Sequence, residues 1–196
     1  MKKIILSSLA VLMTMTMFSQ KGKVLEGDWK SISDIQKYDL EFDYSNVAIP
    51  EFEKEIDYIN QKIKEKEEDE PGTGEIWKQK YFSDRENHFE PKFATSFNKR
   101  DDQKVSKDFD DATHIMKVVV NSSYNGWNVG VMRKAARIDA TISVYNKADN
   151  NQIFSVAYED VRGADALGYD FESHVRVAEA YAKLAKSFMR DLKKKG

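Results

Sequence analysis

Three closely spaced runs of apolar residues constrain the fold of this chain more than any other feature. The runs span residues 113–120, 136–145 and 153–161, and polar segments separate them. The second run alternates apolar and polar residues from Ala136 to Tyr145, which indicates a half-buried β-strand. The first run is apolar at successive positions, which is typical of a central strand. Strand patterns this close together predict an antiparallel meander.

A fourth strand is predicted over residues 37–45, where apolar and aromatic residues alternate with charged ones. Pro50 is predicted to be the first residue of a helix whose apolar stripe runs from Phe52 to Ile63. A second helical region follows over residues 75–99, and Pro91 should kink or split it near His88.

The aromatic residues of that second region repeat at helical spacing. They could form a ligand-binding surface, but such a stripe more often faces the core, and we adopt that interpretation. They are Trp77, Tyr81, Phe82, Phe89, Phe93 and Phe97. A last helix is predicted from an N-cap at Asp170 to the lysines at 193–195.

The order β-α-α-β-β-β-α predicts one α+β domain over residues 21–196. Each helix has one apolar stripe, and each strand has one or two apolar faces. We therefore expect a two-layer domain with a four-stranded, largely antiparallel sheet and helices packed on it.

The first twenty residues have the pattern of a secretory signal peptide. Lys2 and Lys3 precede residues 4–18, of which eleven are apolar, and the small residue Ser19 follows. The apolar stretch is short for a membrane span. We therefore expect export to the periplasm or beyond, with cleavage next to Ser19 or Gln20. The chain has no cysteine, so we expect neither a disulfide nor a lipid-modified cysteine.

Charge and motifs exclude several classes of function. Removal of Lys2 and Lys3 takes the net charge from −2 to −4, which argues against nucleic acid as a partner. The chain contains no zinc-protease, nucleophile-elbow, phosphate-loop or dinucleotide motif. The best metal candidate is the run from Asp108 to His114, with Asp110 and Asp111 between, but it lacks the glycine and terminal glutamate of a calcium loop. We predict no cofactor, no metal site and no catalytic residue.

The segment between the first two meander strands is the best candidate site. It joins strong strand patterns and is too long for a minimal hairpin turn. Trp, Tyr and Arg dominate binding hot spots, so it could stack a sugar ring or dock an extended partner. In the structural alternative, Gly126 and Gly130 adopt positive φ angles and Trp127 folds back on the sheet. The candidate ligand-binding residues are Tyr124, Trp127, Asn128 and Arg133.

The same segment carries a resemblance. The run from Gly126 to Ala136, with Phe42–Ser45, a Trp- and Phe-rich middle helix and the run Val177–Leu184, resembles a family of uncharacterised secreted proteins of Gram-negative envelopes. The element order is more distantly similar to small envelope-assembly domains such as that of the curli-secretion lipoprotein, although this chain lacks the lipidated cysteine. The resemblance implies an envelope α/β domain and no catalytic residues.

These observations favour an exported, non-catalytic binding or assembly module of the cell envelope. Its expected partner is an envelope protein or a glycan, and stable membrane insertion is not expected. One alternative is an envelope hydrolase whose acidic residues converge only in the fold. Another is a carrier of apolar ligands, which requires a cavity between sheet and helices.

Overall fold

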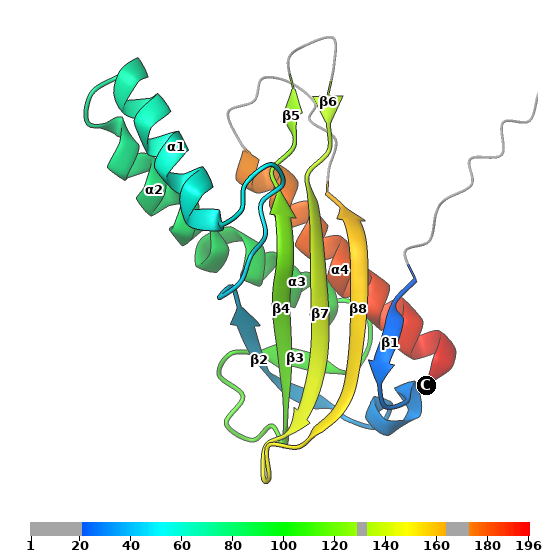
Figure 1. The fold of residues 1–196 in the computed structure, drawn as a ribbon. Helices are drawn as coiled ribbons and strands as arrows, with labels where there is room; N and C mark the ends of the chain where they lie inside the picture. Colours follow the sequence, from blue (N-terminus) through cyan, green and yellow to red (C-terminus); the bar gives the residue numbers. More distant parts are fainter. Residues whose placement is uncertain (1–20, 129–132, 164–172) are drawn as a thin grey trace, which may run out of the picture.

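A six-stranded mixed sheet forms the centre of the molecule (Figure 1). The computed structural model describes residues 21–128, 133–163 and 173–196. Across the sheet the strands lie in the order β1-β8-β7-β4-β2-β3. Their bounds are β1 Lys23–Glu26, β2 Lys37–Asp43, β3 Lys104–Ser106, β4 His114–Tyr124, β7 Arg137–Asn146 and β8 Gln152–Arg162.

The predicted meander is confirmed, because β4 pairs antiparallel with β7 and β7 with β8. The α+β class is also correct, but the four-stranded, largely antiparallel sheet is wrong. The strands β1 and β3 extend the sheet at its two edges, and β2 runs parallel to both β3 and β4. The edge strands have three or four residues, which is too short to show alternation. The direction of β2 is set by the helical crossover that follows it rather than by its own residues.

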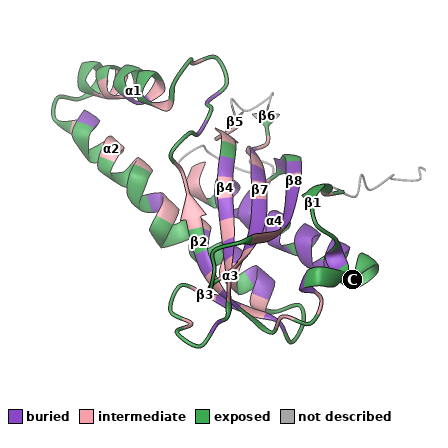
Figure 2. Cartoon of the chain, turned by 60° about the horizontal axis from the view of Figure 1, so that its bottom comes forward, coloured by how far each residue is buried: buried purple, intermediate pink, exposed green. Residues whose placement is uncertain are grey.

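One face of the sheet is covered by α3 (Glu90–Asn98) and α4 (Ser173–Lys195) (Figure 1). Burial is concentrated between these helices and the long strands (Figure 2). Phe93, Phe97 and Phe188 are fully buried there with Met116 and Ile142. The opposite face carries ion pairs, such as Lys117 with Asp43 at 2.9 Å. The domain therefore has two layers.

Two helices, α1 (Glu55–Asp69) and α2 (Thr73–Asp84), form a hairpin that projects beyond the sheet (Figure 1). Pro50 does not begin α1; the helix begins at Glu55, and Glu51 has a positive φ of 75°. The predicted break near His88 is confirmed by a π-helical turn at Arg85–Phe89. Pro91 has no N–H to donate to the carbonyl of Asn87, so regular α-helical bonding cannot continue through this turn.

Two short strands, β5 (Trp127–Asn128) and β6 (Arg133–Lys134), pair beyond the end of the meander. The loop between β2 and α1 lies against the same end of β4. The amide of Ala48 donates to the carbonyl of Asn121 at 2.9 Å, and the amide of Ser123 donates to the carbonyl of Ala48 at 3.0 Å. The predicted helix start at Asp170 lies outside the described residues.

Candidate functional site

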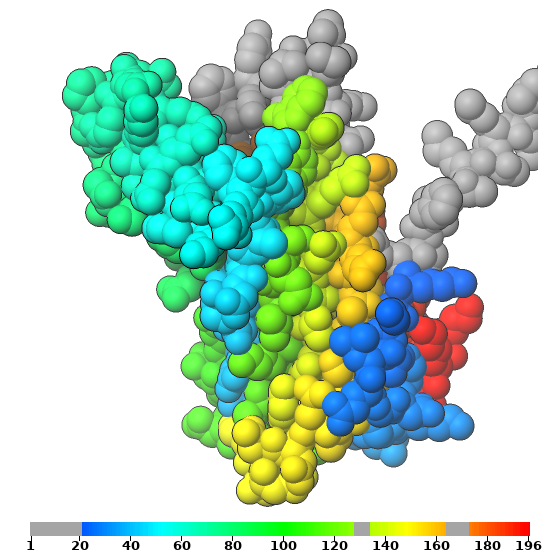
Figure 3. Space-filling model, viewed as in Figure 1, coloured from blue at the N-terminus to red at the C-terminus, as the bar shows by residue number. Residues whose placement is uncertain are grey.

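A cleft of about 610 Å³ lies between the helical hairpin and the end of β4. Its walls come from the loop before α1, from α1 and α2, from the β4–β5 corner and from the first turn of α4. In Figure 3 the hairpin stands beside the upper end of β4. The cleft therefore lies at one end of the sheet and outside the core.

Among the residues that the structure describes, six aromatic side chains line the cleft: Phe52, Tyr58, Trp77, Tyr81, Tyr124 and Trp127. Tyr58 is central to the hairpin wall, because its ring lies 5.2 Å from Phe52, 6.0 Å from Trp77 and 5.9 Å from Tyr81. Trp77 and Tyr81 stack at 5.3 Å with an angle of 26° between their planes. Such edge and offset contacts hold the rings in defined orientations.

Hydrogen bonds connect opposite walls of the cleft. The side-chain amide of Asn125 donates to the Tyr58 hydroxyl at 3.2 Å. Arg176 is 6% exposed, and its Nε donates to the carbonyl of Asn125 at 3.3 Å. The corner of the sheet is thus hydrogen-bonded both to α1 and to α4.

A second set of contacts joins the two ends of the hairpin and reaches Tyr44 outside it. The Arg85 guanidinium and the Tyr81 hydroxyl both donate to Oε1 of Glu55, at 2.5 and 2.7 Å. The guanidinium also lies 4.5 Å from the ring centre of Tyr44. Burial opposes the charge of Arg85, but the hydrogen bond and charge of Glu55 outweigh it and raise the pKa of the guanidinium. Arg85 therefore links the start of α1 to the end of α2 through an ion pair.

Asp84 lines the cleft and forms a cluster of titratable groups with His88 and His174, which do not line it. The imidazole rings are 4.4 Å apart, and Nε2 of His88 is 3.6 Å from the Asp84 carboxylate. Burial raises the pKa of Asp84, although the two histidines and Lys80 oppose that shift. Such a group could exchange protons with a substrate. However, the hollow that Asp84 and His174 share with Glu55 is only about 30 Å³, which is room for a water molecule or two.

The sequence-predicted site is partly assembled at this cleft. Tyr124 and Trp127 line it. Asn128 and Arg133 pair through the backbone of β5 and β6, and their side chains lie outside the described part of the chain. Gly126 has the expected positive φ, at 68°, and a Cβ there would lie 2.3 Å from the carbonyl of Lys134. Val129 and Gly130 lie outside the described residues.

The prediction that the aromatic stripe faces the core is correct for its C-terminal residues and wrong for its N-terminal ones. Phe93 and Phe97 are buried against the sheet, whereas Trp77 and Tyr81 line the cleft. The exposure of Ile76, at 66%, shows that this part of the helix has no apolar surface to pack against on that side. No local signal distinguishes the two ends, because a lysine adjoins Phe93, at position 92, just as one adjoins Trp77, at position 78.

The acidic run before β4 does not reach the cleft. Asp108, Asp110 and Asp111 are exposed, and Asp111 pairs with Lys37 at 2.5 Å. Among the residues that the structure describes, no group of three or more His, Asp or Glu side chains is arranged to hold a metal ion. None of the described helices is both long and apolar enough to cross a membrane.

Comparison of the chain with protein families, with curated proteins and with solved structures found no match. The geometry of the cleft is therefore the basis for any functional assignment.

Proposed function

We propose that this protein is an exported, non-catalytic binding module of the cell envelope, with its ligand in the aromatic cleft. One observation supports this most strongly. Aromatic side chains from the loop before α1, from the hairpin and from the β4–β5 corner converge on one cleft of about 610 Å³. Ligand sites are commonly concave, of this size, and lined by aromatic residues with a few polar groups among them.

Binding accounts for the cleft better than hydrolysis does. An enzyme needs its acid or base within hydrogen-bond reach of a bound substrate. Asp84 lines the cleft, but neither His88 nor His174 does. Asp84 and His174 meet only in the hollow of about 30 Å³, which is too small for a substrate. The carrier alternative has less support. Phe93, Phe97, Tyr181 and Phe188 fill the described layer between the sheet and its helices, and all are at most 2% exposed.

Binding to cell envelopes tests this proposal. Trp77→Ala and Trp127→Ala should each lower the fraction of protein that sediments with an envelope fraction from its own cells by about fivefold or more, because each removes a stacking surface. Both side chains are only partly buried, so Tm should fall by less than about 3 °C.

Ile76→Ala is the matched control. Ile76 precedes Trp77 on the same helix, is exposed and does not line the cleft, so this variant should sediment like the wild type. Wild-type sedimentation of both tryptophan variants would contradict the proposal. Mass spectrometry of the protein recovered from intact cells tests export, since the exported chain should begin near Gln20 or Lys21.

A further inference from the structure

We infer that the cleft binds an acidic saccharide, in which sugar rings stack on the aromatic side chains and carboxylates pair with the lysines at the rim. This inference rests on the proposed function and names the class of ligand for the same cleft.

The lining favours a saccharide over a peptide. A helical peptide docks through aliphatic side chains in apolar pockets, but Ile49 and Pro50 are the only aliphatic side chains among the described lining residues. An extended peptide needs a free strand edge, yet at the cleft β4 is paired with β7 on one side, and on the other the amide of Ser123 donates to the carbonyl of Ala48. What the cleft offers instead is aromatic rings interleaved with polar groups such as Gln61 and Ser123. Sugar rings have C–H faces and hydroxyl edges that match this combination.

The charges at the cleft favour an anion. Of its described lining residues four are basic, against the two acidic residues Glu51 and Asp84. The basic residues are Lys62, Lys66, Lys80 and Arg176. This excess is opposite in sign to the net charge of the whole chain, which is −2. Basic side chains gathered around a hollow raise the local concentration of anionic ligands.

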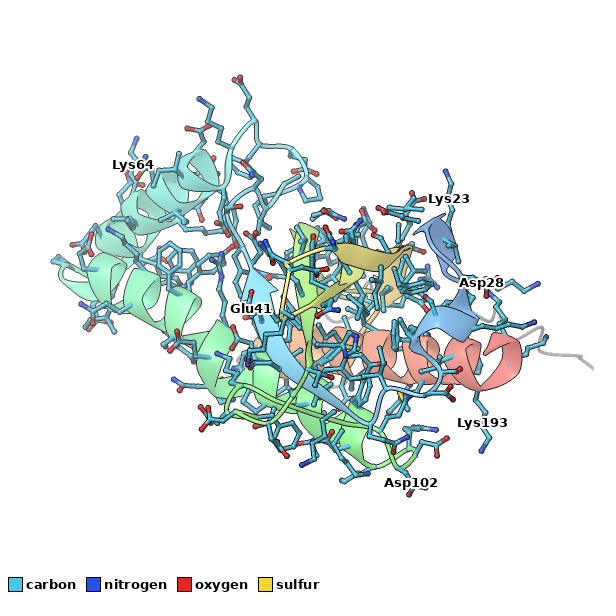
Figure 4. All side chains as sticks on the ribbon, turned by 90° about the horizontal axis from the view of Figure 1, so that it is seen from below. Lys23, Asp28, Glu41, Lys64, Asp102 and Lys193 are labelled. Carbon is cyan, nitrogen blue, oxygen red and sulfur yellow. The ribbon has the colours of Figure 1, made fainter. Side chains whose placement is uncertain are left out.

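The lysines come from both helices of the hairpin. Lys62 and Lys66 are four residues apart on one side of α1, and Lys80 is on α2. Lys62 pairs with Glu65 at 2.6 Å, and Lys66 lies 4.0 Å from Asp69. Ion pairs at an exposed surface are weak, so a carboxylate in the cleft can compete for these ammonium groups. By contrast, Lys64 extends into solvent from the far side of α1, where its side chain is 78% exposed (Figure 4).

A matched pair of probes separates ring stacking from charge. Oligogalacturonate and oligomannuronate should be titrated beside their methyl esters, which keep the rings and remove the negative charge. Binding is read from tryptophan fluorescence, because two of the three tryptophans line the cleft and Trp29 is buried in the core. At least one acid should bind about tenfold more tightly than its ester at low salt, and added salt should reduce that preference.

Lysine variants test whether the preference for the acid over its ester comes from the lysines that line the cleft. The triple variant Lys62→Gln, Lys66→Gln, Lys80→Gln should weaken binding of the acid by about tenfold and leave binding of the ester unchanged. The control triple Lys54→Gln, Lys64→Gln, Lys78→Gln removes the same charge from lysines that do not line the cleft, and it should bind like the wild type. Trp77→Ala should weaken the binding of both forms.

Three outcomes would overturn the inference. Equal affinity for acid and ester removes the role of charge, while the cleft remains the binding site. Binding of poly-glutamate more tightly than either uronate identifies a peptide in place of a saccharide. No binding of any saccharide rejects the ligand class, and envelope sedimentation of the tryptophan variants then decides separately whether the proposed function holds.

Discussion

Asp84 and Asp43 are the same type of residue in opposite environments. Asp84 is 9% exposed, and burial raises the pKa of its carboxyl group. Hydrogen bonds from the side chain and backbone of Ser45 lower the pKa of Asp43 well below its usual range, and Lys117 adds to that effect. Burial thus opposes the charged form of Asp84, while hydrogen bonds stabilise the charged form of Asp43.

Asp84→Asn should therefore stabilise the protein at neutral pH. A carboxyl group with a raised pKa in the folded state contributes stability that is present below the unfolded pKa of about 4 and is lost as pH rises through the folded pKa. The variant avoids that loss, so its free energy of unfolding should exceed the wild-type value at pH 7 by an amount on the order of 1 kcal/mol. At pH 3 the two proteins should be equally stable. Urea unfolding at both pH values measures this.

Asp43→Asn is the control with the opposite sign. A carboxyl group whose pKa is lowered in the folded state contributes stability at pH values above its unfolded pKa of about 4. This stability is lost as the pH falls toward the folded pKa. The variant should therefore be less stable than the wild type at pH 7, and the difference should shrink as pH falls below about 4. If Asp84→Asn destabilised the protein at pH 7 as Asp43→Asn does, the account of Asp84 would be wrong.

At the scale of elements, the hairpin of α1 and α2 forms one wall of the cleft but contributes few side chains to the core. Its exposed apolar residues include Ile56 and Ile76, and Ile59 is its only fully buried aliphatic side chain among the described residues. Its attachment depends on the Arg85–Glu55 pair and on the hydrogen bond between Asn125 and Tyr58. A few polar contacts therefore set the width of the cleft.

Arg85→Met should loosen the hairpin without unfolding the sheet. Methionine is of similar length and can lie against the Tyr44 ring, but it cannot donate to Glu55, whose largely buried carboxylate loses its charge partner. Amide hydrogen exchange over residues 55–84 should become about tenfold faster, while exchange in β4, β7 and β8 should change little. Equal acceleration in the helices and the sheet would show that the hairpin unfolds together with the core.

At the scale of the whole molecule, aromatic packing at the opposite end of the domain holds the two layers together. Phe188 of α4 lies 5.4 Å from Trp29, 6.0 Å from Phe97 and 6.4 Å from Phe154. These partners belong to the N-terminal segment, to α3 and to β8. The chain has no cysteine, so no disulfide supports this packing.

Phe188→Ala should lower the free energy of unfolding by about 3–5 kcal/mol, because it opens a cavity where three elements meet. Ile76→Ala, at an exposed position on the hairpin, should change it by less than about 0.5 kcal/mol. Urea unfolding followed by circular dichroism compares them. A loss for Phe188→Ala below about 1 kcal/mol would mean that the core repacks around the missing ring.

The candidate site was predictable in part. Trp127 and Tyr124 stood out because they interrupt a region of strand pattern with aromatic residues in a long turn. No such signal marks Tyr58, Trp77 or Tyr81 as cleft residues. An aromatic residue at helical spacing looks the same in the sequence whether its helix packs on a sheet or projects from it. The distinction depends on contacts such as that between Asn125 and Tyr58, which are 67 residues apart.

The sequence by itself determined the features that depend on local periodicity. These are the long strands β4, β7 and β8, the alternation of β2, the interruption near Pro91 and the buried stripe of α4 around Phe188. Only the tertiary structure decided which strands flank the meander, that β2 runs parallel to β4, and that short strands extend both edges. It also decided which aromatic side chains line a cleft. The physical reason is that hydrophobic periodicity and helix capping depend on residues only a few positions apart. Strand order and surface shape depend on packing between segments far apart in the chain, which no local pattern encodes.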